Sequence, residues 1–236
     1  MIVLGACGGG RGVAPASDRE ILPAPNTYTV QRGDTLYSIS WRYGMDYRDV
    51  ARKNTIRSPY TIYVGQKLYL SGIKTTGVPT RGASSSSSMP APAPLVVNQK
   101  VSVNTKPQYS TSSKLSWRWP ASGTVVSLYS ASAPGRKGID IAGKSGQPVV
   151  AAAAGQVVYA GNGLPRYGNL LIIKHNDIYL SAYAHNQQLL VREGQTVQAG
   201  QQIAVMGRTG AKSDMLHFEI RHNGKSVDPM RFLPKP

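Results

Sequence analysis

The stretch Pro148-Val149-Val150-Ala151-Ala152-Ala153-Ala154-Gly155-Gln156-Val157-Val158-Tyr159-Ala160 holds two apolar runs that are separated by alanines and a glycine. Their β-branched and aromatic residues favour strands, and glycine suits a tight turn or a close backbone approach between them. Similar runs, bounded by Gly, Asn and Pro, cover residues 123–129, 148–152, 156–160, 170–174, 179–184, 201–206 and 216–221. The pattern predicts an all-β, mostly antiparallel fold for residues 114–236.

Residues 28–72 predict a small α+β module. Two β-type runs enclose two stretches whose apolar residues recur at helical spacing, so the expected order is βααβ. We expect strands over residues 28–30 and 62–70, a first helix that ends at Gly44 and a second helix that ends near Asn54. Asp34 or Thr35 can cap the first helix, because both side chains accept hydrogen bonds from backbone N–H groups.

Two segments lack the pattern of a folded unit. Residues 8–26 are rich in Gly, Pro and Ala, whereas residues 73–113 contain a serine run at 84–88, alternating Pro and Ala at 90–94, and no acid. Such compositions bury too little apolar surface to fold. We therefore expect a tether over residues 1–27 and a disordered linker over residues 73–113.

The net charge of +16 comes from 27 Lys and Arg residues against 11 Asp and Glu residues. A basic surface attracts polyanions, which include cell-wall polymer, acidic lipid and nucleic acid, and charge alone does not choose among them. No recognisable nucleic-acid-binding motif accompanies the charge. We therefore do not expect nucleic acid as a partner.

The single cysteine, Cys7, excludes an internal disulfide bond. The run Met1-Ile2-Val3-Leu4-Gly5-Ala6-Cys7 resembles the end of a bacterial lipoprotein signal, in which Leu, two small residues and Cys mark cleavage and lipidation. The resemblance implies lipidation at Cys7, and Gly8 rather than Asp after it implies the outer membrane. Because only six residues precede Cys7, either the true start lies upstream or Cys7 is an accidental thiol.

The phrases Tyr28-Thr29-Val30, Gly33-Asp34-Thr35-Leu36 and Val64-Gly65-Gln66-Lys67-Leu68 closely resemble the LysM module over residues 28–71. That family binds the N-acetylglucosamine-containing glycan of peptidoglycan in a shallow groove between two loops. The resemblance implies a glycan site made by Gly33, Asp34, Thr35, Leu36, Asn54, Ile56 and residues 59–62. The alternative for Leu36 is a place in the core.

Three motifs in the second half are Arg136-Lys137-Gly138-Ile139-Asp140, Ser181-Ala182-Tyr183-Ala184-His185 and Met215-Leu216-His217. They resemble the active-site motifs of the lysostaphin/LytM zinc metallopeptidases, where the first reads H-x-G-x-D and the last reads H-x-H. The resemblance makes Asp140 and His217 counterparts of zinc ligands and His185 the counterpart of a catalytic histidine. Arg136 stands in place of the remaining ligand, and Met215 in place of the other catalytic histidine.

These replacements remove chemistry that zinc catalysis needs. A catalytic zinc site takes three protein ligands and an open position, whereas a guanidinium repels the cation and a thioether moves no protons. We expect no bound metal, no cofactor and no catalysis. The expected groove floor, a cleft that binds without cutting, comprises Arg136, Asp140, Tyr183, His185, Met215 and His217. The alternative is that these polar residues are ordinary members of a β-rich core.

Lipidated head, LysM module, loose linker and degenerate LytM domain together resemble the NlpD-type murein hydrolase activator lipoproteins. The resemblance implies a non-catalytic activator of periplasmic N-acetylmuramoyl-L-alanine amidases that acts in cell-wall cleavage and cell separation. It also implies a periplasmic location, anchored to the outer membrane, with peptidoglycan bound by LysM and an amidase regulatory segment bound in the former substrate groove. Two alternatives stay open: a zinc endopeptidase with altered ligands, for instance Asp140, His217 and His185, and a passive wall-anchoring protein.

Overall fold

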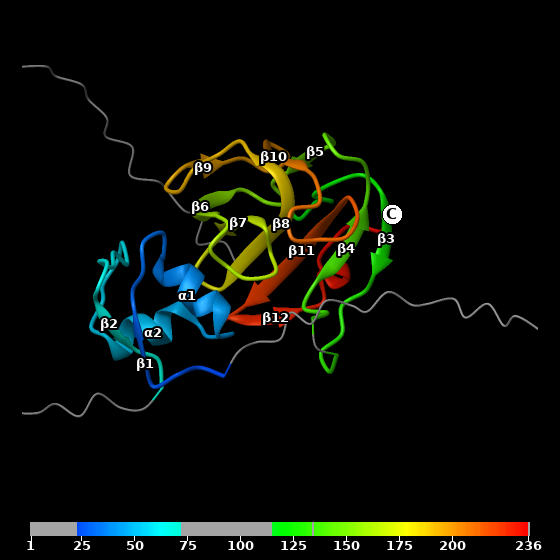
Figure 1. The fold of residues 1–236 in the computed structure, drawn as a ribbon. Coiled ribbons are helices and arrows are strands. Elements are labelled where there is room, and N and C mark those ends of the chain that lie inside the picture. The colour runs from blue at the N-terminus through cyan, green and yellow to red at the C-terminus, as the bar shows by residue number, and fades with distance from the viewer. Residues whose placement is uncertain (1–22, 72–114, 134, 236) are drawn as a thin grey trace, which may run out of the picture.

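The computed structural model of the chain describes residues 23–71, 115–133 and 135–235. The expected lipidation site Cys7 and the expected linker over residues 73–113 lie outside the described residues. Within the described ranges, no helix is both long enough and apolar enough to cross a membrane. The described residues form an N-terminal unit, residues 23–71, and a larger C-terminal unit, residues 115–235 (Figure 1).

The N-terminal unit has the expected order βααβ, with β1 (Thr27–Thr29), α1 (Leu36–Arg42), α2 (Tyr47–Lys53) and β2 (Lys67–Tyr69). Strands β1 and β2 pair antiparallel. Of the two expected caps, Thr35 caps α1, since its side chain accepts a hydrogen bond from the Ser38 N–H at 3.0 Å. The Ser38 hydroxyl in turn accepts from the Thr35 N–H, so the pair satisfies two donors at the helix start.

The prediction of one strand over residues 62–70 is wrong for most of its length. Only β2, near the end of this range, pairs as a strand. The chain turns at Gly65, where φ is +84°, and the Gln66 N–H donates to the Tyr63 carbonyl at 2.9 Å. The turn leaves Tyr63 and Val64 each 71% exposed. The apolar run at residues 62–70 therefore contains an exposed turn followed by a short strand.

The C-terminal unit is a ten-stranded antiparallel sheet, which confirms the expected β fold. Its elements are β3 (Thr124–Ser127), β4 (Ile139–Ala142), β5 (Pro148–Val150), β6 (Gly155–Gly161), β7 (Asn169–Lys174), β8 (Tyr179–Leu189), β9 (Thr196–Val197), β10 (Gln202–Met206), β11 (Met215–His222), β12 (Lys225–Val227) and the 3-10 helix η1 (Pro229–Arg231). The main path is β3-β4-β11-β8-β7-β6-β9; β10 pairs with β5 and β8, and β12 pairs with β11. The strand expected at residues 179–184 continues to Leu189 in β8.

The sheet buries side chains on both faces, and strand β11 shows how. Leu216, Phe218 and Ile220 belong to the larger apolar core on one face. The residues between them, which point the other way because strand side chains alternate, are His217, Glu219 and Arg221. Three polar side chains therefore lie on the face that the N-terminal unit covers.

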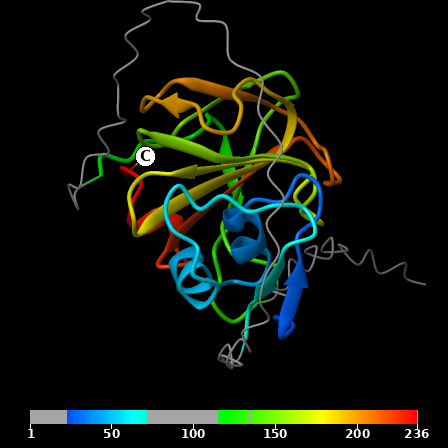
Figure 2. The ribbon, with the colours of Figure 1, turned by 90° about the vertical axis from the view of Figure 1, so that its left-hand side faces the viewer.

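The N-terminal unit packs on that second face (Figures 1 and 2). Trp41, Tyr37 and Tyr47 from its helices share one buried cluster with residues of β6, β7 and β8, namely Val158, Tyr159, Leu170, Ile172, Leu180, Ala182 and Ala184. Figure 2 shows the helices in front of the sheet. Residues that are far apart in sequence thus bury one another, and the contact places α1 next to the polar side chains of β11.

Candidate functional site

His217 and Asp140 are held opposite each other by the pairing of β11 with β4. His217 is 1% exposed, and its Nδ1 lies 2.6 Å from Oδ1 of Asp140. Its other ring nitrogen, Nε2, lies 3.1 Å from Oε1 of Glu219. Both ring nitrogens of His217 therefore face carboxylate oxygens.

Glu219 connects this histidine to the N-terminal unit. Its Oε1 accepts a hydrogen bond from the Tyr167 hydroxyl at 2.7 Å, and its Oε2 lies 3.4 Å from Nε and Nη2 of Arg221. Arg221, which is 2% exposed, donates through Nη1 to the carbonyl oxygen of Trp41 at 2.8 Å. Its guanidinium carbon lies 3.5 Å from the centre of the Trp41 ring, so a stacked cation completes the contact between the units.

The Glu219 carboxyl is ionised despite complete burial. Burial by itself raises its pKa, but the charge of Arg221 and the hydrogen bond from His217 outweigh burial and lower the pKa to about 2. A buried carboxylate is tolerated only when it is paired and hydrogen-bonded. We call Asp140, His217, Glu219 and Arg221 the charged cluster.

His185 joins this cluster, but Tyr183 does not. The His185 ring centre lies 6.1 Å from that of His217, and Nδ1 donates to the Thr209 carbonyl at 2.7 Å, since a carbonyl oxygen only accepts. The side chain of Tyr183, fully buried, belongs to the core on the opposite face and contacts Phe218. Of the residues expected in the groove floor, Tyr183 therefore lies apart from His217, whereas Tyr167 and Glu219, which were not expected there, belong to its buried surroundings.

Arg136 and Met215 lie nearer the surface than the histidines. Both are partly exposed. The Arg136 Nε donates to the carbonyl oxygen of Leu128, just beyond β3, at 2.9 Å. Met215 pairs with Ala142 of β4 and forms a bridge with Gly207. Met215 thus lies at the Ala142 end of β4, next to His217, whereas Arg136 precedes the other end of this strand at Ile139.

The donor set does not fit a zinc site of the peptidase kind. A histidine ligand must present a nitrogen lone pair to the metal, whereas both nitrogens of His217 lie within hydrogen-bond distance of carboxylate oxygens. Within residues 23–71, 115–133 and 135–235, no group of three His, Cys, Asp or Glu side chains is arranged to hold a metal ion.

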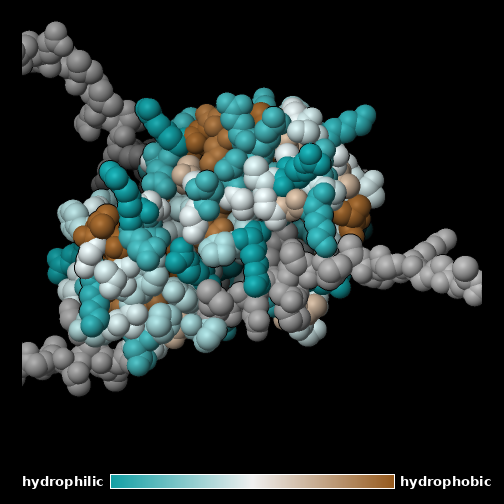
Figure 3. Space-filling view, viewed as in Figure 1, coloured by the Kyte–Doolittle hydropathy of each residue, from teal (hydrophilic) through white to brown (hydrophobic). Residues whose placement is uncertain are grey.

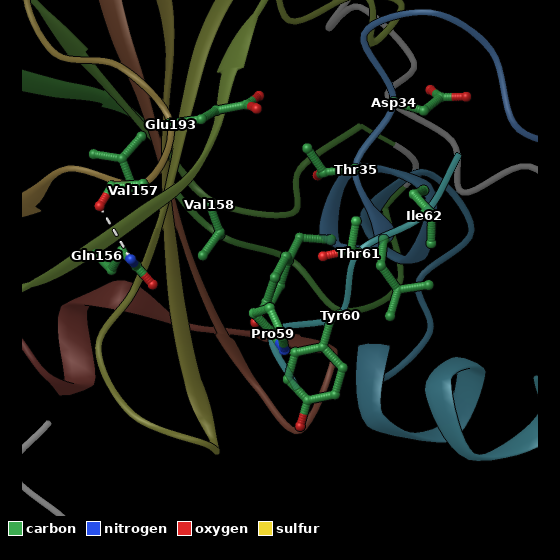
Figure 4. Close-up of a pocket in the computed structure, with 13 residues that line it drawn as sticks. Asp34, Thr35, Pro59, Tyr60, Thr61, Ile62, Gln156, Val157, Val158 and Glu193 are labelled. Atoms are coloured by element: carbon green, nitrogen blue, oxygen red, sulfur yellow. Dashed lines mark hydrogen bonds between the residues drawn. The ribbon is translucent and has the colours of Figure 1, made fainter. Parts of the chain in front are cut away.

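A hollow with a volume of about 350 Å³ lies between the two units (Figure 4). The N-terminal unit lines it with the loop before α1 and residues 59–62 before β2, which are the loops of the expected glycan groove. The C-terminal unit supplies the facing wall from Gln156, Val157, Val158, Glu193 and Gly194. One side of the expected groove thus faces the sheet.

The structure places the expected glycan residues unevenly. Asp34, Thr35 and Leu36 line this hollow, although Leu36 is 1% exposed and belongs to the core. Gly33 lines an adjacent hollow. Asn54 and Ile56 are not among the lining residues of either hollow: Asn54 bonds to the Val50 carbonyl and to both backbone polar groups of Tyr69, and Ile56 packs on the core.

Sequence reasoning missed Glu219, Arg221 and Tyr167. The available signal was alternation, because His217, Glu219 and Arg221 are two residues apart on an expected strand and so share one face. A charged pair on a face that also carries a motif histidine indicates a buried polar network. Tyr167 gave no comparable signal, since it lies in the loop before β7.

Two family models match the chain, the LysM domain over residues 28–71 and peptidase family M23 over residues 134–229. The murein hydrolase activator NlpD of Salmonella dublin is 46% identical over 258 residues, covering 89% of this chain and 68% of that relative. The lipoprotein NlpD/LppB homolog of Pseudomonas aeruginosa is 46% identical over 244 residues, covering 95% of this chain and 82% of that relative. Outer membrane antigenic lipoprotein B of Haemophilus influenzae is 39% identical over 260 residues, covering 89% and 64%.

Proposed function

Because the chain belongs to the NlpD family of murein hydrolase activators, we propose that it activates N-acetylmuramoyl-L-alanine amidases without cutting peptidoglycan itself. The observation that carries this proposal is the charged cluster. His217 is enclosed by two carboxylates where a peptidase would present a metal ligand. A site of this kind cannot activate a water molecule, so a partner would have to bind on the surface beside it.

The partner surface that we propose runs from Met215, at one end of β4, to Arg136, before its other end, and we call it the rim. A partly exposed thioether suits an apolar helix face, and a guanidinium pairs with acidic side chains. Leu128, whose carbonyl accepts from Arg136, is 53% exposed, and Val126 of the edge strand β3 is 60% exposed. Figure 3 shows a hydrophobic group near β3 at the right, one of several on this face. An amidase regulatory segment would find apolar contact and positive charge together.

The remaining parts of the proposal concern place and anchoring. We propose that residues 28–72 hold peptidoglycan and that residues 114–236 hold the amidase, with residues 73–113 as the linker. The names of the relatives include lipoprotein and outer membrane lipoprotein. They support a periplasmic protein that is tethered to the outer membrane through a lipid on Cys7.

Purified chain added to a panel of amidases on dye-labelled sacculi tests the proposal. We expect no dye release by the chain alone and, with one amidase, release well above that of the amidase alone. Release of cross-link peptides by the chain alone, with near-equimolar zinc after purification, would instead establish the altered-ligand endopeptidase. Binding to sacculi without stimulation of any amidase would leave the passive anchor.

A further inference from the structure

The hollow between the two units has the chemistry of a carbohydrate site on both walls. Its N-terminal wall offers the hydroxyl groups of Thr35 and Thr61, and its C-terminal wall offers the amide of Gln156 and the carboxylate of Glu193. In Figure 4 the Glu193 side chain extends toward Thr35, whereas the Asp34 carboxylate points away from the C-terminal unit. Apolar surface comes from Tyr60, Ile62 and Val158, among others.

The charge in this hollow differs from that of the chain as a whole. Its lining residues include two acids, Asp34 and Glu193, and none of the 27 Lys and Arg residues. A carboxylate only accepts hydrogen bonds, and sugar hydroxyl and acetamido N–H groups are neutral donors for it. The basic surface attracts polyanions, but this hollow favours a neutral polyol over an anion.

The hollow is also large enough to hold a ligand. Its volume of about 350 Å³ falls in the range of about 300–1,000 Å³ that ligand sites occupy. A larger hollow, of about 640 Å³, shares Asp34 and Glu193 with it, reaches Gly163 after β6, and is also lined by Arg32, Arg42 and Arg192. The two hollows therefore adjoin along the boundary between the units.

Hydrogen bonds within the C-terminal unit hold its wall of the hollow in place. Gln156 of β6 donates through Nε2 to the Gly194 carbonyl at 3.0 Å, which ties the strand to the turn that carries Glu193. One carboxylate oxygen of Glu193 accepts from the Ala160 N–H at 3.1 Å. Glu193 is thereby oriented before any ligand arrives, which reduces the entropy cost of binding.

We infer that the C-terminal unit forms the second wall of the glycan site, so that an N-acetylated amino-sugar chain is held between both units through Gln156 and Glu193. The inference rests on the proposed glycan binding by residues 28–72 and extends it. Glycan binding by residues 28–72 then also depends on Gln156 and Glu193, which are more than 80 positions away in the sequence. It also fixes the N-terminal unit against the face that carries the charged cluster.

Calorimetric titration of the full chain with an N-acetylglucosamine pentamer tests the inference. We expect Glu193→Gln and Gln156→Ala each to weaken binding about three- to tenfold, because the first replaces a charged acceptor by a neutral amide and the second removes an amide. The controls are Asp214→Asn and Gln202→Ala, which alter a carboxylate and a glutamine outside the hollow. We expect these controls to bind within about twofold of the parent chain.

The possible results distinguish a failure of this inference from a failure of the proposed glycan binding by residues 28–72. If the parent chain fails to bind the pentamer, glycan binding itself is wrong and the inference falls with it. If the parent binds and both wall variants bind equally well, the C-terminal wall is wrong while glycan binding stands. Thermal melting checks folding, and Glu193→Gln alone decides the result if Gln156→Ala melts early, because it preserves the shape of the side chain.

Discussion

Two histidines are buried in the same sheet domain with both ring nitrogens hydrogen-bonded, but their partners differ. In the charged cluster, His217 lies between two carboxylates and is joined through Glu219 to Arg221. In His175, Nδ1 instead lies 2.8 Å from the Ala154 carbonyl oxygen, and Nε2 lies 2.7 Å from the Ser181 hydroxyl oxygen. The Ser181 hydroxyl is also hydrogen-bonded to the Tyr183 hydroxyl. We call His175, Ser181 and Tyr183 the neutral cluster.

The difference shows what each cluster requires of the fold. Burial lowers the pKa of His175 to about 4, so this ring is neutral near pH 7 and needs only hydrogen-bond partners. Glu219, with a pKa of about 2, is charged and needs a buried cation as well. A buried histidine is therefore weak evidence of a former active site, whereas a buried charged network beside the motif residues is stronger evidence.

The largest expected effect comes from breaking the charged cluster with Glu219→Ala. The change leaves the Arg221 guanidinium buried without its counter-charge, and losing one partner of a buried ion pair costs about 3–5 kcal/mol of unfolding free energy. Urea denaturation followed by circular dichroism measures the loss. Glu193→Ala removes an exposed carboxylate and should change the unfolding free energy by less than about 1 kcal/mol.

A Glu219→Ala protein as stable as the Glu193→Ala control would mean that water reaches Arg221. In that case the N-terminal unit would not seal this face of the sheet. The contrast with the neutral cluster would then lose its basis.

Acid should weaken the two clusters in different pH windows. The folded-state pKa of His175 is about 4 against an ordinary value of 6.5, so the unfolded chain binds more protons between them. The contribution of His175 to the free energy of unfolding is therefore fully present above pH 6.5 and is lost as the pH falls to about 4. This contribution amounts to ~3 kcal/mol. For Glu219, stability is complete above its ordinary pKa of 4.5 and is lost as the pH falls to about 2.

Unfolding free energies of the parent chain, measured from pH 7 to pH 2, test these windows. His175→Gln should flatten the decline between pH 6.5 and pH 4 relative to the parent, and His222→Gln, at a partly exposed position, serves as its control. An unchanged slope in His175→Gln would show that this ring is not held neutral by burial.

The smallest expected effect belongs to the neutral cluster. Ser181→Ala removes the partner of His175 Nε2 and of the Tyr183 hydroxyl, and an unsatisfied buried polar group costs about 1–3 kcal/mol. Ser145→Ala, which removes an exposed hydroxyl bonded to Gln187, should cost less than about 0.5 kcal/mol. Thermal melting compares the two. If Ser181→Ala destabilises as much as Glu219→Ala, charge does not separate the clusters.

Much of the fold could be predicted because local patterns carry it. Apolar runs gave seven strands of the C-terminal unit, and helical spacing with Thr35 gave α1. Short or polar elements such as β9 and β12 carry too few residues for a pattern. The turn at Gly65 shortened an expected strand, because only backbone geometry distinguishes an apolar turn from an apolar strand.

The candidate site was predicted in part for a similar reason. Tyr183 and His185 are two residues apart and share a face in a regular strand. Here His185 has φ of +67°, and the pairing of β8 with β7 gains one residue between Tyr183 and Asn186, which is a bulge. The bulge separates the two side chains. The packing of the N-terminal unit on Arg221 joins segments 180 residues apart, and no local pattern predicts it.

Amidase stimulation by Met215→Glu tests the central proposal most directly, that the rim beside the charged cluster holds the amidase. The new carboxylate would have to lose its hydration against an apolar segment, so we expect stimulation to fall at least tenfold. Leu190→Glu, at another partly exposed apolar position of the C-terminal unit, should stimulate like the parent chain. A folded Met215→Glu protein that stimulates the amidase as well as Leu190→Glu does would contradict the proposal and move the partner surface away from this rim.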